Sequence, residues 1–101
     1  MSVIEVNKEN FRREVLESDR PVLLDFWAPW CGPCRMVGPV VEEIAAERGD
    51  IKVGKVHVDE QPELAEQFQI MSIPSLFVVR DGRITGRMVG ARPKDAILAM
   101  L

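Results

Sequence analysis

The chain has 101 residues, of which 47% are hydrophobic and 29% charged, and its formal net charge is −3. This length corresponds to about one domain with one modest core. The acidic balance argues against a nucleic-acid partner, because contacts with phosphates need clustered lysine and arginine. No stretch approaches the roughly 20 apolar residues that span a membrane, and the first residues show no signal peptide. We therefore expect one soluble, monomeric, cytoplasmic domain over residues 1–101, with no nucleic-acid or membrane partner.

The first half of the chain alternates between helical and strand patterns. Asn7 is a suitable helix N-cap, because its side-chain oxygen can accept a hydrogen bond from an amide one turn later. Phe11 and Val15 follow at helical spacing. Residues 22–28 form a nearly continuous apolar run with one aspartate inside it, which predicts a strand covered on both faces.

A longer helix is predicted from Cys31 to about Arg48. Its apolar residues form one broad stripe: Met36, Val37, Val40, Val41, Ile44 and Ala45. Residues 51–58 then predict a further strand, and residues 62–68 a short helix.

The second half of the chain begins with a hairpin pattern. Residues 75–80 and 83–89 have strand composition, and the Asp81-Gly82 pair between them favours a tight turn. A final helix is predicted from Pro93, with four residues buried: Ala96, Ile97, Met100 and Leu101. This order of elements predicts an α/β fold, with a mixed sheet between two layers of helices.

The two cysteines, Cys31 and Cys34, lie only three positions apart, so no disulfide scaffold holds the fold. They can be a redox pair, half of a zinc site or two small buried side chains. A structural zinc site needs about four ligands, and the chain adds only the single His57. The redox interpretation is favoured, because the CxxC motif stands between a predicted strand and a predicted helix.

The start of a helix suits thiol chemistry. Unpaired N–H groups and the helix dipole favour an anion there, so the pKa of Cys31 should be lowered and Cys31 should attack as the thiolate. Cys34, one turn later, can close a disulfide and should be the more buried, resolving thiol. Gly32 permits close approach of a partner, and Pro33 stiffens the loop.

The segment DFWAPWCGPCR, from Asp25 to Arg35, resembles the active-site motif of the thioredoxin family. The resemblance spans nearly the whole chain, through Lys55, Ile73-Pro74, Asp81-Gly82 and Val89-Gly90-Ala91. It implies a thioredoxin fold, with a five-stranded mixed sheet flanked by four α-helices. It also implies a general protein disulfide reductase that binds no cofactor or metal, reduces disulfide-containing client proteins and is recharged from NADPH by thioredoxin reductase. The Gly-Pro pair between the cysteines resembles the reductive members of the family.

Asp25 is the most unusual residue of the first strand. Its apolar neighbours suggest burial, which should raise the pKa of the carboxyl group, although a strand with one exposed face would leave it solvated. The family resemblance implies that Asp25 is the general base for Cys34. It also places Lys55 near that carboxylate, whereas the pattern alone is equally compatible with an ordinary solvated lysine.

The surface around the disulfide is expected to bind partners. The resemblance implies a cis peptide bond before Pro74 and backbone pairing of Ile73 with an extended substrate. Trp30 is a candidate for an exposed aromatic contact, whereas Trp27 fits the core. The expected binding surface consists of Trp30, Gly32, Pro33, Ile73, Pro74, Gly90 and Ala91.

Two functions are compatible with the CxxC motif and the expected binding surface. The leading one is a thiol–disulfide oxidoreductase in which Cys31 attacks and Cys34 resolves. The alternative is a redox-dependent binding module or subunit, which docks partners through the same surface with incidental turnover. We interpret His57 as structural or solvated. Two charged stretches are interpreted as solvated faces: an acidic one with Asp59, Glu60, Glu63 and Glu66, and a basic one with Arg80, Arg83, Arg87, Arg92 and Lys94.

Overall fold

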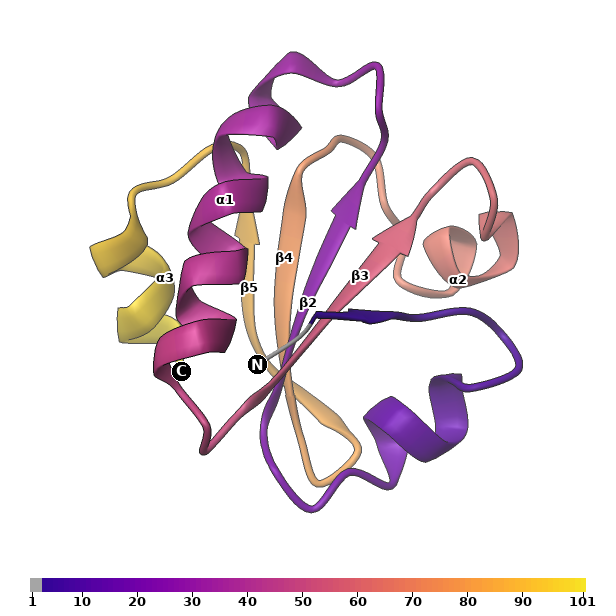
Figure 1. Cartoon of the computed structure of the whole chain (residues 1–101). Helices are drawn as coiled ribbons and strands as arrows, with labels where there is room; N and C mark the ends of the chain where they lie inside the picture. The colour runs from indigo at the N-terminus through magenta and orange to yellow at the C-terminus, as the bar shows by residue number, and fades with distance from the viewer. Residues whose placement is uncertain (1–2) are drawn as a thin grey trace.

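The computed structural model describes residues 3–101; Met1 and Ser2, which belong to the expected domain, lie outside the described residues. Five strands and four helices follow one another along these residues (Figure 1). In chain order they are β1 (Ile4–Glu5), η1 (Arg12–Leu16), β2 (Val22–Trp27), α1 (Gly32–Glu47), β3 (Lys52–His57), α2 (Pro62–Gln67), β4 (Ser75–Arg80), β5 (Arg83–Val89) and α3 (Lys94–Met100).

The strands form one mixed sheet in the order β1-β3-β2-β4-β5. β3 runs parallel to both β1 and β2, whereas β4 runs antiparallel to β2 and β5. The predicted mixed five-stranded sheet is confirmed. β2 is central and is buried from Val22 to Phe26, as its apolar sequence predicts.

The hairpin between β4 and β5 follows directly from its turn residues. Asp81 and Gly82 have positive φ angles of 51° and 77°, which is the backbone that a two-residue hairpin turn requires. Arg80 and Arg83 pair across the turn. The prediction of this hairpin is therefore confirmed to the residue.

Asn7 accepts the predicted hydrogen bond, but the first helix begins later: its N-cap residue is Phe11, without a side-chain cap. The helix is also more widely wound than an α-helix. The Asn10 N–H donates to Oδ1 of Asn7 at 2.8 Å, and the Asn7 N–H donates back to Oδ1 of Asn10 at 2.9 Å. The Glu17 N–H then bonds to the Arg12 carbonyl oxygen, five residues earlier. η1 is therefore π-helical, and α1, α2 and α3 are the α-helices.

Helices cover both faces of the sheet, as Figure 1 shows for α1 and α3 on one side and α2 on the other. The α2 side contains the cluster Val6, Phe11, Val15, Val22, Leu24, Phe26, Val56, Leu64, Phe68, Phe77 and Val79. The α1 side contains Leu23, Val37, Val41, Ile44, Ala45, Ile51, Val53, Leu76, Val78 and Ile97. Because side chains alternate along a strand, each central strand supplies both clusters.

Two expectations about the core are wrong in detail. Met36 is 70% exposed, although it was placed in the buried stripe of α1. A turn of 100° per residue separates Met36 from Val37, and the sheet covers only the narrower face that carries Val37 and Val41. In α3 only Ile97 is fully buried; its neighbours Ala96, Met100 and Leu101 are half-buried.

Candidate functional site

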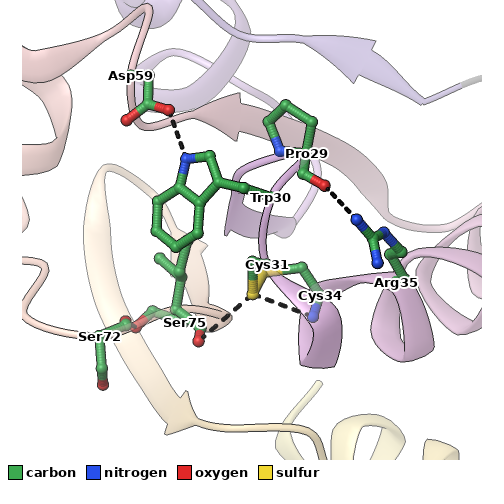
Figure 2. The surroundings of a disulfide bond; sticks show 9 residues. Pro29, Trp30, Cys31, Cys34, Arg35, Asp59, Ser72 and Ser75 are labelled. Carbon is green, nitrogen blue, oxygen red and sulfur yellow. Dashed lines mark hydrogen bonds between the residues drawn. A yellow bond between two sulfur atoms is a disulfide. The ribbon is translucent and has the colours of Figure 1, made fainter.

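The two cysteines lie at the start of α1, immediately after the β2–α1 loop. Cys31 is the N-cap residue, with extended backbone, so the helix begins one residue later than expected. Its Sγ accepts a hydrogen bond from the Cys34 N–H at 3.2 Å, which satisfies one of the free amides of the helix start. A disulfide joins Cys31 to Cys34, with Cα atoms 5.3 Å apart (Figure 2).

Each cysteine lines a different hollow. Cys31 borders a hollow of about 500 Å³ together with Trp30, Pro33 and Ile73. Cys34 borders another of about 380 Å³ whose lining includes Lys55. The expectation that Cys34 is the more buried is wrong, because each residue is 5% exposed. The two sulfurs therefore differ in what surrounds them and not in how much surface they expose.

The loop before β4 lies against Cys31. The Ile73–Pro74 peptide bond is cis, as the family resemblance implies. The Ile73 carbonyl oxygen lies 3.7 Å from Sγ of Cys31, and the Ser75 hydroxyl donates to the Ser72 carbonyl oxygen at 2.6 Å. This loop brings backbone that can pair with an extended chain next to the disulfide.

The expected partner-binding residues gather around this hollow only in part. Trp30, Gly32, Pro33 and Ile73 line it together with Cys31. Buried Pro74 is linked to the other expected loop, because the Gly90 N–H donates to the Pro74 carbonyl oxygen at 2.8 Å. Ala91 is exposed on that loop but does not line the hollow.

Trp30 is held by a residue that sequence reasoning missed. The indole is 65% exposed, and its Nε1–H donates to Oδ2 of Asp59 at 2.7 Å (Figure 2). Asp59 was interpreted as part of a solvated acidic stretch. The available signal was its place just after β3, since the carboxyl ends of parallel β2 and β3 meet at one edge of the sheet.

Arg35 also stabilises the β2–α1 loop, a role that its sequence pattern does not predict. Its guanidinium donates to the Pro29 carbonyl oxygen at 3.0 Å, which ties the first turn of α1 to the loop that carries Trp30 (Figure 2). The geometry of the helix start is therefore fixed from both sides of Cys31.

Asp25 is buried on the same side of the sheet as α1. It is 1% exposed and pairs in register with Lys55 of β3 and Leu76 of β4. Because side chains alternate along β2, Asp25 shares the face of Leu23, which packs in the cluster under α1. The alternative of a solvated Asp25 is excluded, and neither carboxylate oxygen has a hydrogen-bond partner among residues 3–101.

Burial raises the pKa of Asp25 from 3.8 to about 6, and the positive charge of Lys55 opposes that rise. The interpretation of Lys55 as an ordinary solvated lysine is wrong. Its Nζ lies 4.4 Å from the centre of the Trp27 ring, a cation–π contact. Lys55 also lines the hollow that reaches Cys34. Lys55, whose charge acts on the buried Asp25 carboxyl group, therefore lines the same hollow as Cys34.

Trp27 has more than the core role predicted for it. Its ring is half-buried and forms the cation–π contact with Lys55. The same ring stacks on the imidazole of His57, with ring centroids 5.0 Å apart. Nδ1 of His57 lies 3.2 Å from a carboxylate oxygen of Glu60. His57 is thus a half-buried structural residue, in agreement with its interpretation from the sequence.

The described residues contain no cluster of three or more histidine, cysteine or acidic side chains suited to a metal ion. Within the same part of the chain, no helix combines the length and hydrophobicity that crossing a membrane requires.

Comparison with known proteins agrees with this geometry. The thioredoxin family model matches residues 2–101. A thioredoxin of Mycobacterium tuberculosis is 52% identical over 101 residues, covering 99% of this chain and 87% of that protein. Thioredoxin 1 of a Nostoc species is 54% identical over 94 residues, covering 92% of this chain and 88% of that protein.

A third relative is a longer protein. The bifunctional thioredoxin reductase/thioredoxin of Mycobacterium leprae is 51% identical over 96 residues, which cover 94% of this chain and 21% of that protein. The alternative of a binding module is not favoured by these matches together with the Cys31–Cys34 pair. The chain belongs to the thioredoxin family, and it is a thiol–disulfide oxidoreductase that reduces disulfides of client proteins.

Proposed function

We propose that Cys31 is the attacking thiol and Cys34 the resolving thiol of a general protein disulfide reductase. In the first step the Cys31 thiolate attacks one sulfur of the client disulfide, which releases the other client sulfur as a thiolate that takes a proton from water. In the second step Cys34 loses its proton and attacks Sγ of Cys31. This breaks the mixed disulfide and releases the second client sulfur as a thiolate. The client leaves with both cysteines reduced, and its two electrons come from the Cys31 and Cys34 thiols, which are oxidised to the Cys31–Cys34 disulfide.

The different hollows that the two cysteines line carry this assignment. Cys31 faces the hollow with Trp30 and the Ile73 carbonyl group, where a client chain can approach. It also occupies the helix N-cap, where free N–H groups stabilise a thiolate. Cys34 faces the hollow that contains Lys55, so its neighbourhood is suited to moving a proton and not to receiving a client.

Asp25 is proposed as the general base for Cys34. A carboxyl group with a pKa of about 6 is mostly ionised near neutral pH yet remains a usable proton acceptor. Its oxygens form no hydrogen bond within residues 3–101, so they can accept one from a water molecule that relays the proton of Cys34. Lys55 is proposed as a positioning residue that keeps the carboxylate ionised.

The partner surface is proposed to consist of Trp30, Gly32, Pro33, Ile73, Pro74, Gly90 and Ala91. Backbone pairing at Ile73 recognises an extended client segment without selecting its side chains. The apolar lining of the hollow beside Trp30 adds contact area with little sequence preference. Such a surface suits many clients.

The remaining proposals concern the electron source and the compartment. A reductase fused to a thioredoxin in the Mycobacterium leprae relative supports a thioredoxin reductase as the partner that recharges the disulfide with electrons from NADPH. This chain itself then needs no bound cofactor. A reducing compartment such as the cytoplasm fits a chain whose two cysteines both serve the redox site.

Insulin reduction by dithiothreitol tests the assignment. The wild-type chain should strongly accelerate the appearance of turbid, reduced insulin, and Cys31→Ser should abolish the acceleration. Cys34→Ser should accumulate a mixed disulfide between Cys31 and the client, visible as a mass increase that dithiothreitol reverses. A mixed disulfide that forms at residue 34 in Cys31→Ser, and none at residue 31 in Cys34→Ser, would reverse the roles.

A further inference from the structure

A further hollow, distinct from the one at Cys34, adjoins the hollow that Cys31 lines; we call it the second hollow of the client surface. It has a volume of about 740 Å³, and its lining includes Glu66, Gln69 and Arg87. Three residues line both hollows: Ala65, Ile70 and Met71. The surface beside the disulfide therefore continues past Met71 toward β5.

Met71 forms the border between the two hollows. Its side chain is 97% exposed, the highest value among the large hydrophobic residues that the structure leaves open to solvent. An apolar side chain so open, next to a site for extended chains, offers contact to whatever crosses it. Gln69, with a positive φ of 54°, turns the chain after α2 toward this position.

Arg87 is the cation at the far end of the second hollow. It is exposed on β5, and its guanidinium lies over the ring of Phe77, 5.3 Å from the centre. Within residues 3–101, no carboxylate lies within 4.0 Å of it. The stacking restricts the side chain while leaving its N–H groups available, and a planar guanidinium suits a carboxylate.

We propose that a client chain bound at Cys31 continues over Met71 into the second hollow, where Arg87 contacts a carboxylate side chain of the client. This inference rests on the proposed function of the Cys31 hollow and adds to it a preference for acidic client segments. Glu66 lines the same hollow without pairing with Arg87, so it weakens the preference and supplies an internal control.

The position of the client carboxylate follows from the strand register. Val89 pairs with Ser75, beside the cis-proline loop, and Arg87 pairs with Phe77, two residues further along β4. Two strand residues span about 7 Å, and three residues of an extended client span about 10 Å. A client carboxylate about two to three residues from its cysteine therefore spans this distance, and the test places it at the longer spacing.

The test uses short peptides whose single cysteine is capped by a 2-thiopyridyl group. Prereduced protein attacks the peptide sulfur, and the released thiopyridone reports the rate by absorbance. The peptides are identical except for Glu or Lys three residues before or after the cysteine. We expect kcat/KM of the wild type to favour Glu over Lys about two- to fivefold on one side of the cysteine, as for an exposed charge pair. The preference should vanish at high salt.

Variants assign the preference to this hollow. Arg87→Glu should invert it, and Glu66→Gln should increase it. Arg83→Glu, the same charge change four residues away on β5, should leave the preference as it is. Met71→Ser should lower the rates with all four peptides. It should not lower the rate with cysteamine capped by the same 2-thiopyridyl group, because this molecule is too small to reach Met71 from Cys31.

The outcomes separate this inference from the function on which it rests. An unchanged preference in Arg87→Glu, or an equal inversion in Arg83→Glu, would overturn the inference even though capped cysteamine is still attacked. Failure of the wild type to attack capped cysteamine would instead contradict the role of Cys31.

Discussion

The two faces of the sheet differ in the side chains that they bury. On the α2 side, four phenylalanines pack in edge-to-face or tilted contacts, with neighbouring ring centres 4.9 to 5.8 Å apart. On the α1 side, the apolar cluster ends at a buried carboxyl group, Asp25, with Lys55 as its register neighbour. Asp25 is the only buried acidic residue among residues 3–101.

This difference separates stability from chemistry within one small domain. Aromatic packing on the α2 side contributes stability without ionisable groups. Burial of Asp25 is unfavourable by itself, and it holds a proton acceptor on the side of the sheet that α1 covers. Substitutions on the two faces should therefore have opposite effects on the free energy of unfolding.

The largest expected effect is on the α2 side. Phe26 is fully buried between Phe68 and Phe77. Phe26→Ala should lower the free energy of unfolding by about 3–5 kcal/mol, because it leaves a cavity. Urea unfolding of the disulfide form measures this. The smaller change Phe26→Leu should cost less. Insulin reduction per folded molecule should stay close to that of the wild type for both variants, and a loss of turnover in folded protein would contradict the separation.

Asp25→Asn should have the next largest effect, and with the opposite sign. The pKa of Asp25 is raised from 3.8 to about 6 in the folded chain, so between these values the folded state binds more protons than the unfolded state. The stability of the wild type therefore falls as pH rises through this window. By pH 7 the difference between the two pKa values has cost the wild type about 3 kcal/mol of unfolding free energy. This is the upper bound on the stability that Asp25→Asn can add.

Urea unfolding between pH 4 and pH 7 checks this sign. The wild type should lose stability toward pH 7, and Asp25→Asn should show a flatter profile. Asp25→Ala, which also removes the amide, should have the same flat profile. A wild-type profile that rises over this window would show that Asp25 is stabilised as the carboxylate.

Lys55→Met should have a smaller effect. It should shift the pH range over which the free energy of unfolding falls. Lys55 opposes the effect of burial on Asp25, so its removal should raise the pKa of Asp25 further. The pH above which unfolding free energy stops falling should move upward. Lys52→Met removes a lysine of the same strand that pairs with Glu14, and it should leave that pH unchanged.

Local features of the fold could be predicted because a few neighbouring residues determine them. The Asp81-Gly82 turn needs only two residues that tolerate positive φ. The run from Val22 to Phe26 predicted a covered strand, since burial on both faces leaves little room for polar residues.

Features that depend on distant segments could not be predicted. The place of β3 between β1 and β2 depends on pairing between residues some 30 to 50 positions apart in sequence. The exposure of Met36 depends on how wide a face of α1 the sheet covers. The contacts of Trp30 with Asp59 and of Lys55 with Trp27 join two strand ends that only the fold brings together.

The resolving step tests the account most directly. A client mixed disulfide is formed on Cys31 at low pH, and its resolution by Cys34 is then followed by rapid quenching between pH 5 and pH 8. We predict that the wild-type rate rises with an inflection near pH 6, the pKa of Asp25, and that Asp25→Asn resolves more slowly without this inflection. Superimposable profiles for the two proteins would contradict the role of Asp25 and remove the chemical reason for its burial.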